Sequence, residues 1–475
     1  MKKTKIICTM GPNSDDREVM KQLVLNGMDV ARFNFSHGNH EEHKKRYLQL
    51  RQVAEETGIP VAALLDTKGP EIRTGILKDG NKITLKEGQE FTLTTEEVVG
   101  DETMVHINYD GLNGDVKAGD RILIDDGLIE LHVREVQGPR IVCLVVNGGE
   151  LGERKGVNVP GVKIKLPALT EKDKDDIRFG MEMGFDYIAA SFIRSADAIR
   201  EIREILAEGG SSMGIIAKIE NEEGLENLDD IIEESDGIMV ARGDLGVEIP
   251  FVEVPAIQKQ IVSKCRMLGK RVIVATEMLE SMIHNIRPTR AEISDVANAV
   301  YEGASAVMLS GESAAGKYPV DAVRTMAEVA EYTEEKIDYR NRFRKTDFTT
   351  KNILDAISHS ACQMAIDVEA KCVIVSSVSG LTARMVSRFR NAVPIIGTTI
   401  RPKVYRKLAL SWGVIPVLCE EYESMDVLFF HAMKEATRIL NLEVGDNVIM
   451  MGGKLSGITG NTNMIKFETI KRIYE

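Results

Sequence analysis

The sequence predicts an α/β fold: a (β/α)8 barrel (TIM barrel) with a small β-barrel lid domain inserted into it and an α/β domain after it. Three observations lead to this prediction. Short apolar runs end in polar or charged residues, helical segments alternate with those runs, and one long stretch has no helical period. Alternating strands and helices are typical of a parallel sheet, and eight such runs are enough to close a barrel.

The predicted barrel strands become charged or polar only at their C-terminal ends. Because side chains alternate along a strand, Lys218 lies beside Glu220, and we expect Arg242 to lie beside Asp244. Each pair taken alone is also typical of a surface salt bridge. The active site of a (β/α)8 barrel lies at this end of its strands. The eight predicted strands span residues 5–8, 29–36, 61–68, 187–191, 214–220, 237–244, 272–277 and 306–312.

Helix starts and stops lie between the predicted strands. Residues 289–292 (Thr-Arg-Ala-Glu) form a capping-box pattern before an apolar segment, and Gly303 follows as a stop. Residues 170–173 begin another helix in the same way. These signals support the alternation that the barrel requires.

The domain organisation follows from where this alternation stops. From residue 70 to 166 the helical period disappears and Gly-Asp turns recur, which predicts an inserted β domain that closes over the barrel as a lid. After a polar linker, strand candidates at 371–375, 393–397 and 447–451 predict a C-terminal α/β domain. The predicted domains are residues 1–69 and 167–343 (barrel), 70–166 (lid) and 344–475 (C-terminal).

Composition limits the classes of function. A net charge of −13 and a pI near 5.4 argue against a nucleic acid or an anionic membrane as partner. No apolar run has the length of a signal-peptide core or of a transmembrane helix. The six cysteines are scattered without a Cys-x-x-Cys motif, which is typical of a reducing compartment. We therefore expect a cytoplasmic protein.

Two segments come close to known motifs. Residues 311–317 match a phosphate-binding P-loop up to its last position, where Tyr318 replaces the Ser or Thr that would hold magnesium. Pro319 favours a strand-to-helix connection instead. His40 and His43 are three residues apart, whereas a zinc helix needs four. A solvated helix face is the preferred interpretation.

Longer motifs resemble the pyruvate kinase family along nearly the whole chain. The motifs are residues 66–73 (DTKGPEIR), 219–221 (IEN), 278–283 (MLESMI) and 288–292 (PTRAE). The resemblance implies transfer of the phosphoryl group of phosphoenolpyruvate to ADP, giving pyruvate and ATP in glycolysis. Because the chain stops at Glu475, we expect no additional C-terminal phosphotransfer-like domain. The alternative is another magnesium-dependent barrel enzyme acting on phosphoenolpyruvate or a related enolate, a mutase or lyase; a silent metabolite sensor is a third.

The resemblance also implies roles for single residues. Glu220 and Asp244 match the ligands of Mg²⁺ (or Mn²⁺), and hard carboxylate oxygens suit either ion. The residues implied in substrate binding and catalysis are Lys218 and Arg32 at the transferred phosphoryl group, Gly243 and Asp244 at the substrate carboxylate, and Thr276 with Ser310 in protonating the enolate.

A potassium site and a nucleotide site are implied in the same way. The potassium ligands are Asn34, Ser36, Asp66 and Thr67, and we expect Asp66 to lack a countercharge when the ion is absent. Glu71 stands where members independent of potassium have lysine. The residues implied in binding ADP or ATP are Asn34, His37, Arg73 and Lys155.

A regulatory site is predicted in the C-terminal domain. Ser377, Ser379 and Thr382 match the loop with which activated family members bind the phosphate of a sugar phosphate or nucleotide, before a helix expected near Ala383. Val378 replaces the lysine of animal enzymes that bind fructose 1,6-bisphosphate. Lys454, in a glycine-rich segment from 452 to 460, is a candidate for the missing charge. The family implies a homotetramer.

Overall fold

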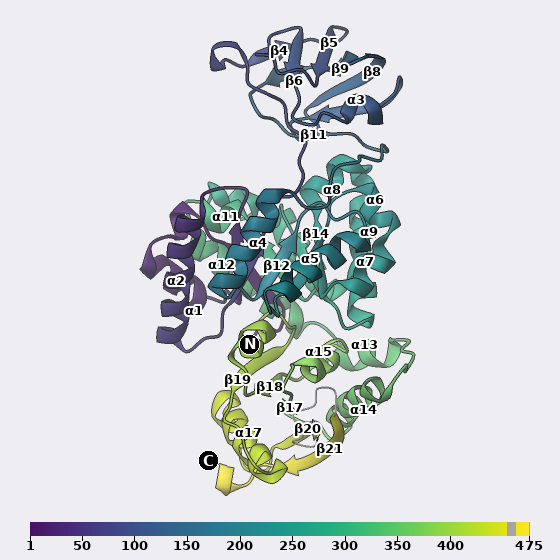
Figure 1. The fold of residues 1–475 in the computed structure, drawn as a ribbon. Coiled ribbons are helices and arrows are strands. Elements are labelled where there is room, and N and C mark those ends of the chain that lie inside the picture. Colours follow the sequence, from purple (N-terminus) through teal and green to yellow (C-terminus); the bar gives the residue numbers. More distant parts are fainter. Residues whose placement is uncertain (454–461, 475) are drawn as a thin grey trace.

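The structure, a computed structural model, describes residues 1–453 and 462–474. Three bodies lie in a row, with a β domain at one end, a barrel in the middle and an α/β domain at the other end (Figure 1). Eight parallel strands close the barrel in the order β1-β16-β15-β14-β13-β12-β3-β2. These strands are the eight that the sequence predicts: β1 (Lys5–Thr9), β2 (Val30–Asn34), β3 (Ala62–Asp66), β12 (Tyr187–Ala190), β13 (Gly214–Ile219), β14 (Gly237–Ala241), β15 (Arg271–Ala275) and β16 (Ala306–Leu309).

Helices surround the barrel and bury the outward-facing side chains of its strands. Both predicted capping boxes are present, at Thr170 before α4 and at Thr289 before α10, and Gly303 ends α10 in the left-handed conformation. The helices are α1 (Arg17–Leu25), α2 (His40–Thr57), α4 (Glu171–Met183), α5 (Ala196–Glu208), α6 (Glu222–Glu226), α7 (Leu228–Glu234), α8 (Arg242–Glu248), α9 (Val254–Met267), α10 (Arg290–Glu302), α11 (Gly311–Ala314) and α12 (Pro319–Glu335), with short 3-10 turns η1 (Pro12–Ser14), η3 (Phe251–Glu253) and η4 (Glu280–Ile283).

The predicted pairing of Arg242 with Asp244 is wrong. Strand β14 ends at Ala241, and both residues lie in helix α8 rather than on an extended strand. The Arg242 guanidinium donates to both carboxylate oxygens of Asp295 on α10, each at 2.7 Å. It also donates to the carbonyl of Ala275, so Arg242 stabilises the loop after β15.

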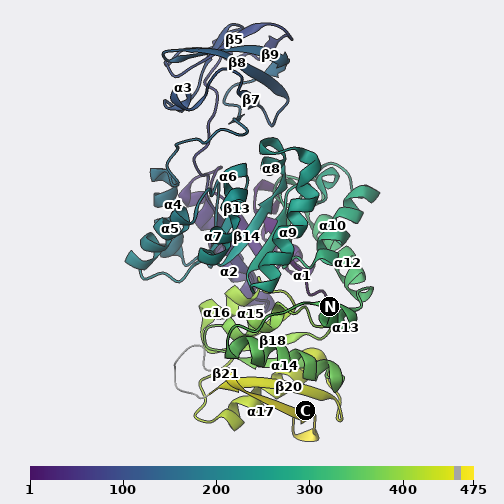
Figure 2. The same ribbon diagram turned by 90° about the vertical axis from the view of Figure 1, so that its right-hand side faces the viewer.

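The inserted body is built from β-strands around its own apolar core. The chain leaves the barrel after β3 and returns before α4 (Figure 2). Six strands form one sheet in the order β11-β7-β8-β9-β5-β6, and β4 pairs with β10. The elements are η2 (Lys78–Gly80), β4 (Ile83–Leu85), β5 (Glu90–Thr94), β6 (Met104–His106), α3 (Leu112–Asp115), β7 (Arg121–Ile124), β8 (Ile129–Gln137), β9 (Arg140–Asn147), β10 (Gly149–Leu151) and β11 (Val157–Asn158).

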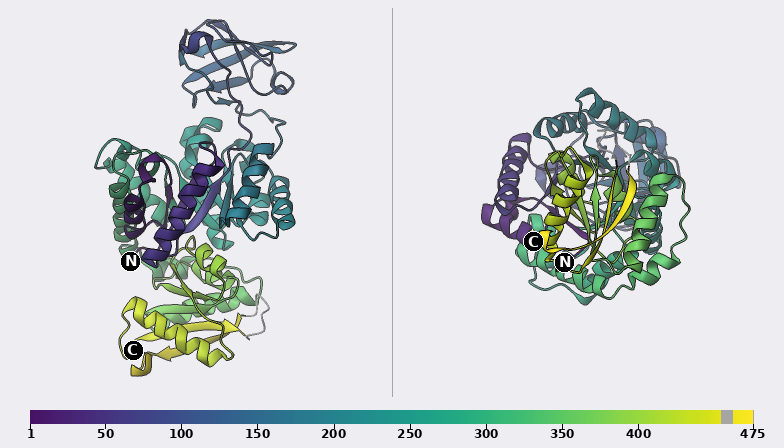
Figure 3. Two further views of the ribbon diagram at one scale, coloured as in Figure 1. Left: turned by 60° about the vertical axis from the view of Figure 1, so that its left-hand side comes forward. Right: turned by 90° about the horizontal axis from the view of Figure 1, so that it is seen from below.

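The C-terminal body is a five-stranded sheet between helices, on the far side of the barrel from the insert (Figure 3). Strand order is β19-β18-β17-β20-β21, with β21 antiparallel to β20. The sequence predicts β17, β18 and β20, but not β19, which contains Pro416, or the largely polar β21. The elements are α13 (Tyr339–Lys345), α14 (Ile353–Asp367), β17 (Cys372–Ser376), α15 (Leu381–Ser387), β18 (Ile395–Thr399), α16 (Pro402–Leu408), β19 (Val414–Leu418), α17 (Met425–Leu440), β20 (Asn447–Gly453), β21 (Thr462–Thr469) and η5 (Arg472–Tyr474).

Within residues 1–453 and 462–474, no helix combines the length and apolar character that a membrane span requires.

Candidate active site

Lys218 is at the centre of the polar end of the barrel. Its ammonium donates to the Ser191 hydroxyl at 2.8 Å and pairs with the carboxylates of Glu220 at 2.8 Å and Asp66 at 3.3 Å. The side chain is buried. Burial lowers the pKa of Lys218, but Asp66 and Glu220 outweigh it and raise the pKa above its ordinary value. The rim therefore has a permanently charged ammonium in a fixed position.

Glu220 and Asp244 are two acidic groups that resist ionising together. Burial raises the pKa of Glu220 to about 7, and Asp244 adds to the effect, although Lys218 opposes it. Burial also raises the pKa of Asp244, and Asp126 and Glu71 add to it. A divalent cation between the two carboxylates would favour their ionised forms. Their hard oxygen atoms thus fit Mg²⁺ or Mn²⁺.

Arg32 and Asp66 form a buried ion pair beside Lys218. Arg32 Nε lies 2.5 Å from Asp66 Oδ2, and Arg32 Nη1 donates to the Thr9 hydroxyl at 2.9 Å. Burial raises the pKa of Asp66, but Arg32 and Lys218 together bring it below its ordinary value. The expectation that Asp66 lacks a countercharge is therefore wrong, because two side-chain cations already supply one.

The four residues implied for potassium meet at one corner of the rim. Asn34 and Asp66 are direct partners on the neighbouring strands β2 and β3. The Asn34 side-chain oxygen accepts a hydrogen bond from the Ser36 amide at 3.1 Å, and the Thr67 carbonyl accepts one from the Ser191 hydroxyl at 2.7 Å. One carboxylate and several neutral oxygens in one place fit a large monovalent cation.

Thr276 lies on strained backbone directly after β15. It has a φ of 68° and Glu277 a φ of 54°, which is unfavourable for a β-branched residue such as threonine. The Thr276 hydroxyl donates to the Ala275 carbonyl at 2.6 Å and accepts from the Gly243 amide at 2.9 Å. The loop thereby holds this hydroxyl against the start of α8, beside Asp244.

Ser310 follows the neighbouring strand β16. Its amide donates to Glu312 at 2.7 Å, and the same buried carboxylate accepts from the Leu279 amide at 3.0 Å. Glu312 thus ties the loops after β15 and β16 together. Within the described residues, the Ser310 hydroxyl makes no hydrogen bond to Thr276, so the two residues follow paired strands without forming a connected relay.

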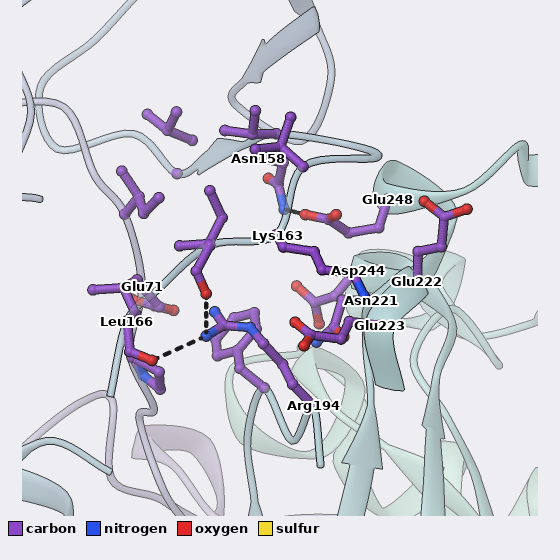
Figure 4. Close-up of a pocket in the computed structure, with 18 of the residues that line it drawn as sticks. Glu71, Asn158, Lys163, Leu166, Arg194, Asn221, Glu222, Glu223, Asp244 and Glu248 are labelled. Carbon is purple, nitrogen blue, oxygen red and sulfur yellow. Dashed lines mark hydrogen bonds between the residues drawn. The ribbon is translucent and has the colours of Figure 1, made fainter. Parts of the chain in front are cut away.

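A cavity of about 530 Å³ lies between the rim and the inserted domain. Asp244 and Glu223 border it from the barrel, and Lys163 and Asn158 from the insert (Figure 4). Arg73 and Lys155, implied in nucleotide binding, also line it; their cationic groups pair with Glu71 at 2.7 Å and Asp125 at 2.9 Å. Asn34 and the exposed His37, implied in the same role, are not among the lining residues.

The sequence did not lead us to assign a role to Ser191 or to its neighbour Phe192. Ser191 supports Lys218, and the Phe192 amide donates to Glu220 at 2.5 Å. Phe192 has a φ of 54°, so the turn is strained where it holds the rim. The available signal was the polar end of the run 187–191.

The residues implied in effector binding do lie in one loop. The Ser377 and Ser379 hydroxyls accept from the amides of Gly380 at 3.1 Å and Leu381 at 3.4 Å, where α15 begins. The Thr382 hydroxyl is buried and hydrogen-bonded to Thr462 at 2.6 Å. Lys454 and the glycine-rich segment after Gly453 lie outside the described residues.

The two near-motifs have structural roles. His43 is 3 % exposed and stacks on Phe35 with ring centroids 4.1 Å apart, and His40 stacks on Phe179. The interpretation of a solvated helix face is therefore wrong for His43, because its ring packs in the core. Residues 311–317 connect β16 to α12, as predicted.

A (β/α)8 barrel with a buried lysine, an arginine and paired carboxylates at its rim defines an enzyme that acts on an anionic substrate. The family model "Pyruvate kinase, barrel domain" matches residues 1–323, and "Pyruvate kinase, alpha/beta domain" matches residues 355–467. The chain belongs to the pyruvate kinase family, and it is a phosphotransferase with the function of that family.

Named relatives match nearly the full chain. The pyruvate kinase of Clostridium acetobutylicum is 47% identical over 475 residues, which cover 99% of this chain and 100% of that protein. The pyruvate kinase of Geobacillus stearothermophilus is 49% identical over 473 residues, covering 99% and 80%. A crystal structure of a pyruvate kinase from Cryptosporidium parvum matches with a TM-score of 0.94 and 41% identity, covering 98% of this chain and 96% of that one.

Proposed function

We propose that the phosphoryl group of phosphoenolpyruvate is transferred to ADP around Lys218, giving pyruvate and ATP in glycolysis. The observation on which this rests is the Lys218 ammonium, buried and held by Ser191, Glu220 and Asp66. A group in transfer has spread negative charge and needs cations in fixed positions rather than a covalent partner. Lys218 and Arg32 supply them, both on the inner side of the rim.

The remaining rim residues bind substrate and move a proton. Mg²⁺ or Mn²⁺, held by Glu220 and Asp244, would neutralise charge on the enolate and phosphoryl oxygens. The Gly243 amide and the start of α8 are assigned to the substrate carboxylate, for which the amide would exchange its present acceptor, the Thr276 hydroxyl. Thr276, whose hydroxyl both donates and accepts, is assigned to pass a proton to the enolate carbon, together with Ser310 from the loop after β16. Potassium is assigned to Asn34, Ser36, Asp66 and Thr67.

The inserted domain is proposed as a lid over bound nucleotide. Arg73 and Lys155 line the cavity from the insert and would bind ADP phosphates. Asn34 and His37, which do not line it, are assigned to the nucleotide from β2 and its loop. Asn158 bridges the cavity to Glu248 of α8 at 2.7 Å. The proposed domain boundaries are 1–69 with 167–343, 70–166 and 344–475. A cytoplasmic homotetramer is the proposed form of the enzyme.

A coupled assay for pyruvate tests the proposed reaction. We expect pyruvate to appear only when phosphoenolpyruvate, ADP and a divalent cation are all present. A mutase or lyase has no use for Arg73 and Lys155 beside the rim, so its activity would persist without ADP. Turnover of phosphoenolpyruvate that is indifferent to ADP would contradict the proposal.

Effector binding is a separate prediction, at the loop of Ser377 and Ser379. We expect calorimetric titration to show binding of at least one of fructose 1,6-bisphosphate, ribose 5-phosphate and AMP, because the Ser377 and Ser379 hydroxyls, which accept from the amides of Gly380 and Leu381, can still donate to phosphate. Ser379→Ala should weaken that binding, whereas Ser360→Ala, on exposed α14 surface, should not. The absence of heat with all three compounds would rule out the effector pocket.

A further inference from the structure

The floor of the barrel meets the C-terminal domain at α15 and α16 (Figure 2), and basic residues from both bodies lie at this junction. Arg271 begins β15 at the floor, Arg384 belongs to α15, and Lys407 is in the last turn of α16. Arg271 Cζ lies 5.3 Å and Lys407 Nζ 5.8 Å from the ring centroid of the buried Tyr187. These three basic residues and Tyr187 are here called the floor cluster.

The floor cluster has fewer carboxylates nearby than cations. Asp236 is the acidic group with the strongest influence on both Arg384 and Lys407, but it also pairs with Arg203 at 3.3 Å. Asp186 is engaged by Arg406 at 2.8 Å and by a second arginine from α2 at 3.4 Å. Neither carboxylate is therefore available to the floor cluster alone.

Several donors of the floor cluster have no acceptor. Arg271 is 7 % exposed; its Nη2 donates to the Ser411 hydroxyl at 3.2 Å, while its Nε is buried without a partner. Arg384 has a buried Nε without a partner, and its guanidinium makes no hydrogen bond or ion pair within the described residues. Lys407 donates to the Ser212 carbonyl at 2.9 Å. Buried donors left unpaired are rare and costly.

The pKa values of Arg384 and Lys407 reflect the same excess of cations over carboxylates. Burial lowers the pKa of Arg384 to about 10, and Arg271 adds to the effect. Burial and then Arg271 lower the pKa of Lys407 to about 8. The cationic forms of Arg384 and Lys407 are thus destabilised by their surroundings, as expected where a counter-anion belongs.

We propose that the floor cluster binds a small tetrahedral oxyanion, phosphate or sulfate, between the barrel floor and the C-terminal domain. Guanidinium groups match the oxygens of such an anion, and its charge would balance the surplus cations. Arg271 belongs to the barrel, whereas Arg384 and Lys407 belong to the C-terminal domain. The bound anion would therefore strengthen the docking of the two domains, at a place distinct from the rim and from the effector loop.

Thermal unfolding of the full chain tests this site, with inorganic phosphate as the probe. At low ionic strength, about 10 mM phosphate should raise Tm by about 2 °C more than sodium chloride of equal ionic strength, because the anion binds only the folded form. Arg271→Gln and Lys407→Gln should each lose at least half of this shift. Arg438→Gln, which removes an exposed arginine paired with Glu435 on α17, should keep it.

Phosphate can also bind at the rim or the effector loop, so the comparison among variants decides the location. An equal phosphate response in the original chain and all three variants would place the anion elsewhere and overturn the proposal. A response lost in both floor variants and kept in Arg438→Gln supports it.

Arg384→Gln tests whether the charge of Arg384 stabilises or destabilises the folded protein when no phosphate is added. Without added phosphate it should raise Tm by about 1 °C, because it removes a buried charge with no partner. An arginine with a merely structural role would lower Tm instead, as we expect for Arg388→Gln, whose guanidinium pairs with Asp355 at 2.6 Å. A lower Tm for Arg384→Gln in phosphate-free buffer would also overturn the proposal.

Discussion

Lys218→Met is expected to lower kcat by about a thousandfold or more while the protein stays folded. A cation beside the transferred phosphoryl group acts mainly in the transition state, so its loss raises the barrier by on the order of several kcal/mol. Methionine has a similar length and is apolar, which suits this buried position. Asp66 keeps its ion pair with Arg32, and Glu220 keeps the hydrogen bond from the Phe192 amide.

Three measurements separate this catalytic role from a structural one. The coupled assay gives kcat, circular dichroism reports the fold, and Mn²⁺ binding followed by electron paramagnetic resonance reports the metal site. Lys264→Met is the matched control, because Lys264 is a surface residue on α9 that pairs with Asp229. More than about a tenth of the original kcat in Lys218→Met, with the control unchanged, would show that the assigned role is wrong.

Activity is expected to fall more than tenfold when potassium is replaced by a bulky organic cation at constant ionic strength, with sodium a poor substitute. The reason is not that Asp66 would lack a countercharge without potassium, since Asp66 already pairs with Arg32 and Lys218. A monovalent cation at Asn34, Ser36 and Thr67 would share the charge of Asp66. Arg32 and Lys218 would then be available to the anionic substrate.

Glu71→Lys is expected to restore part of the activity lost without potassium. Glu71 pairs with Arg73 at 2.7 Å and lies 3.9 Å from the Lys68 ammonium, close to the rim. A lysine there would add a positive charge, whereas the matched variant Glu71→Gln removes the carboxylate without adding one and should restore nothing. If the original enzyme ran equally fast with potassium and with the organic cation, the potassium site would be absent.

The sequence determined the architecture of this protein, because that information is local. A strand in a parallel barrel is buried on both sides, so its apolar run and polar C-terminal end are visible in any short window, as in residues 214–220. The capping boxes at Thr170 and Thr289 depend on four consecutive residues. The roles of residues at the rim were inferred from longer motifs that match the family. The structure brings most of these residues together.

Only the tertiary structure decided which side chains meet across elements. Arg242 pairs with Asp295 on another helix, and Ser191 supports Lys218 from the adjoining strand, so neither pairing can be seen in a run of consecutive residues. Asp66 finds its countercharges in the same way. The floor cluster joins β15 to α15 and α16, and both helices lie more than a hundred residues after β15 along the chain. Periodicity reports the backbone conformation of one segment, whereas ion pairing and burial depend on how the barrel closes and where the C-terminal domain docks.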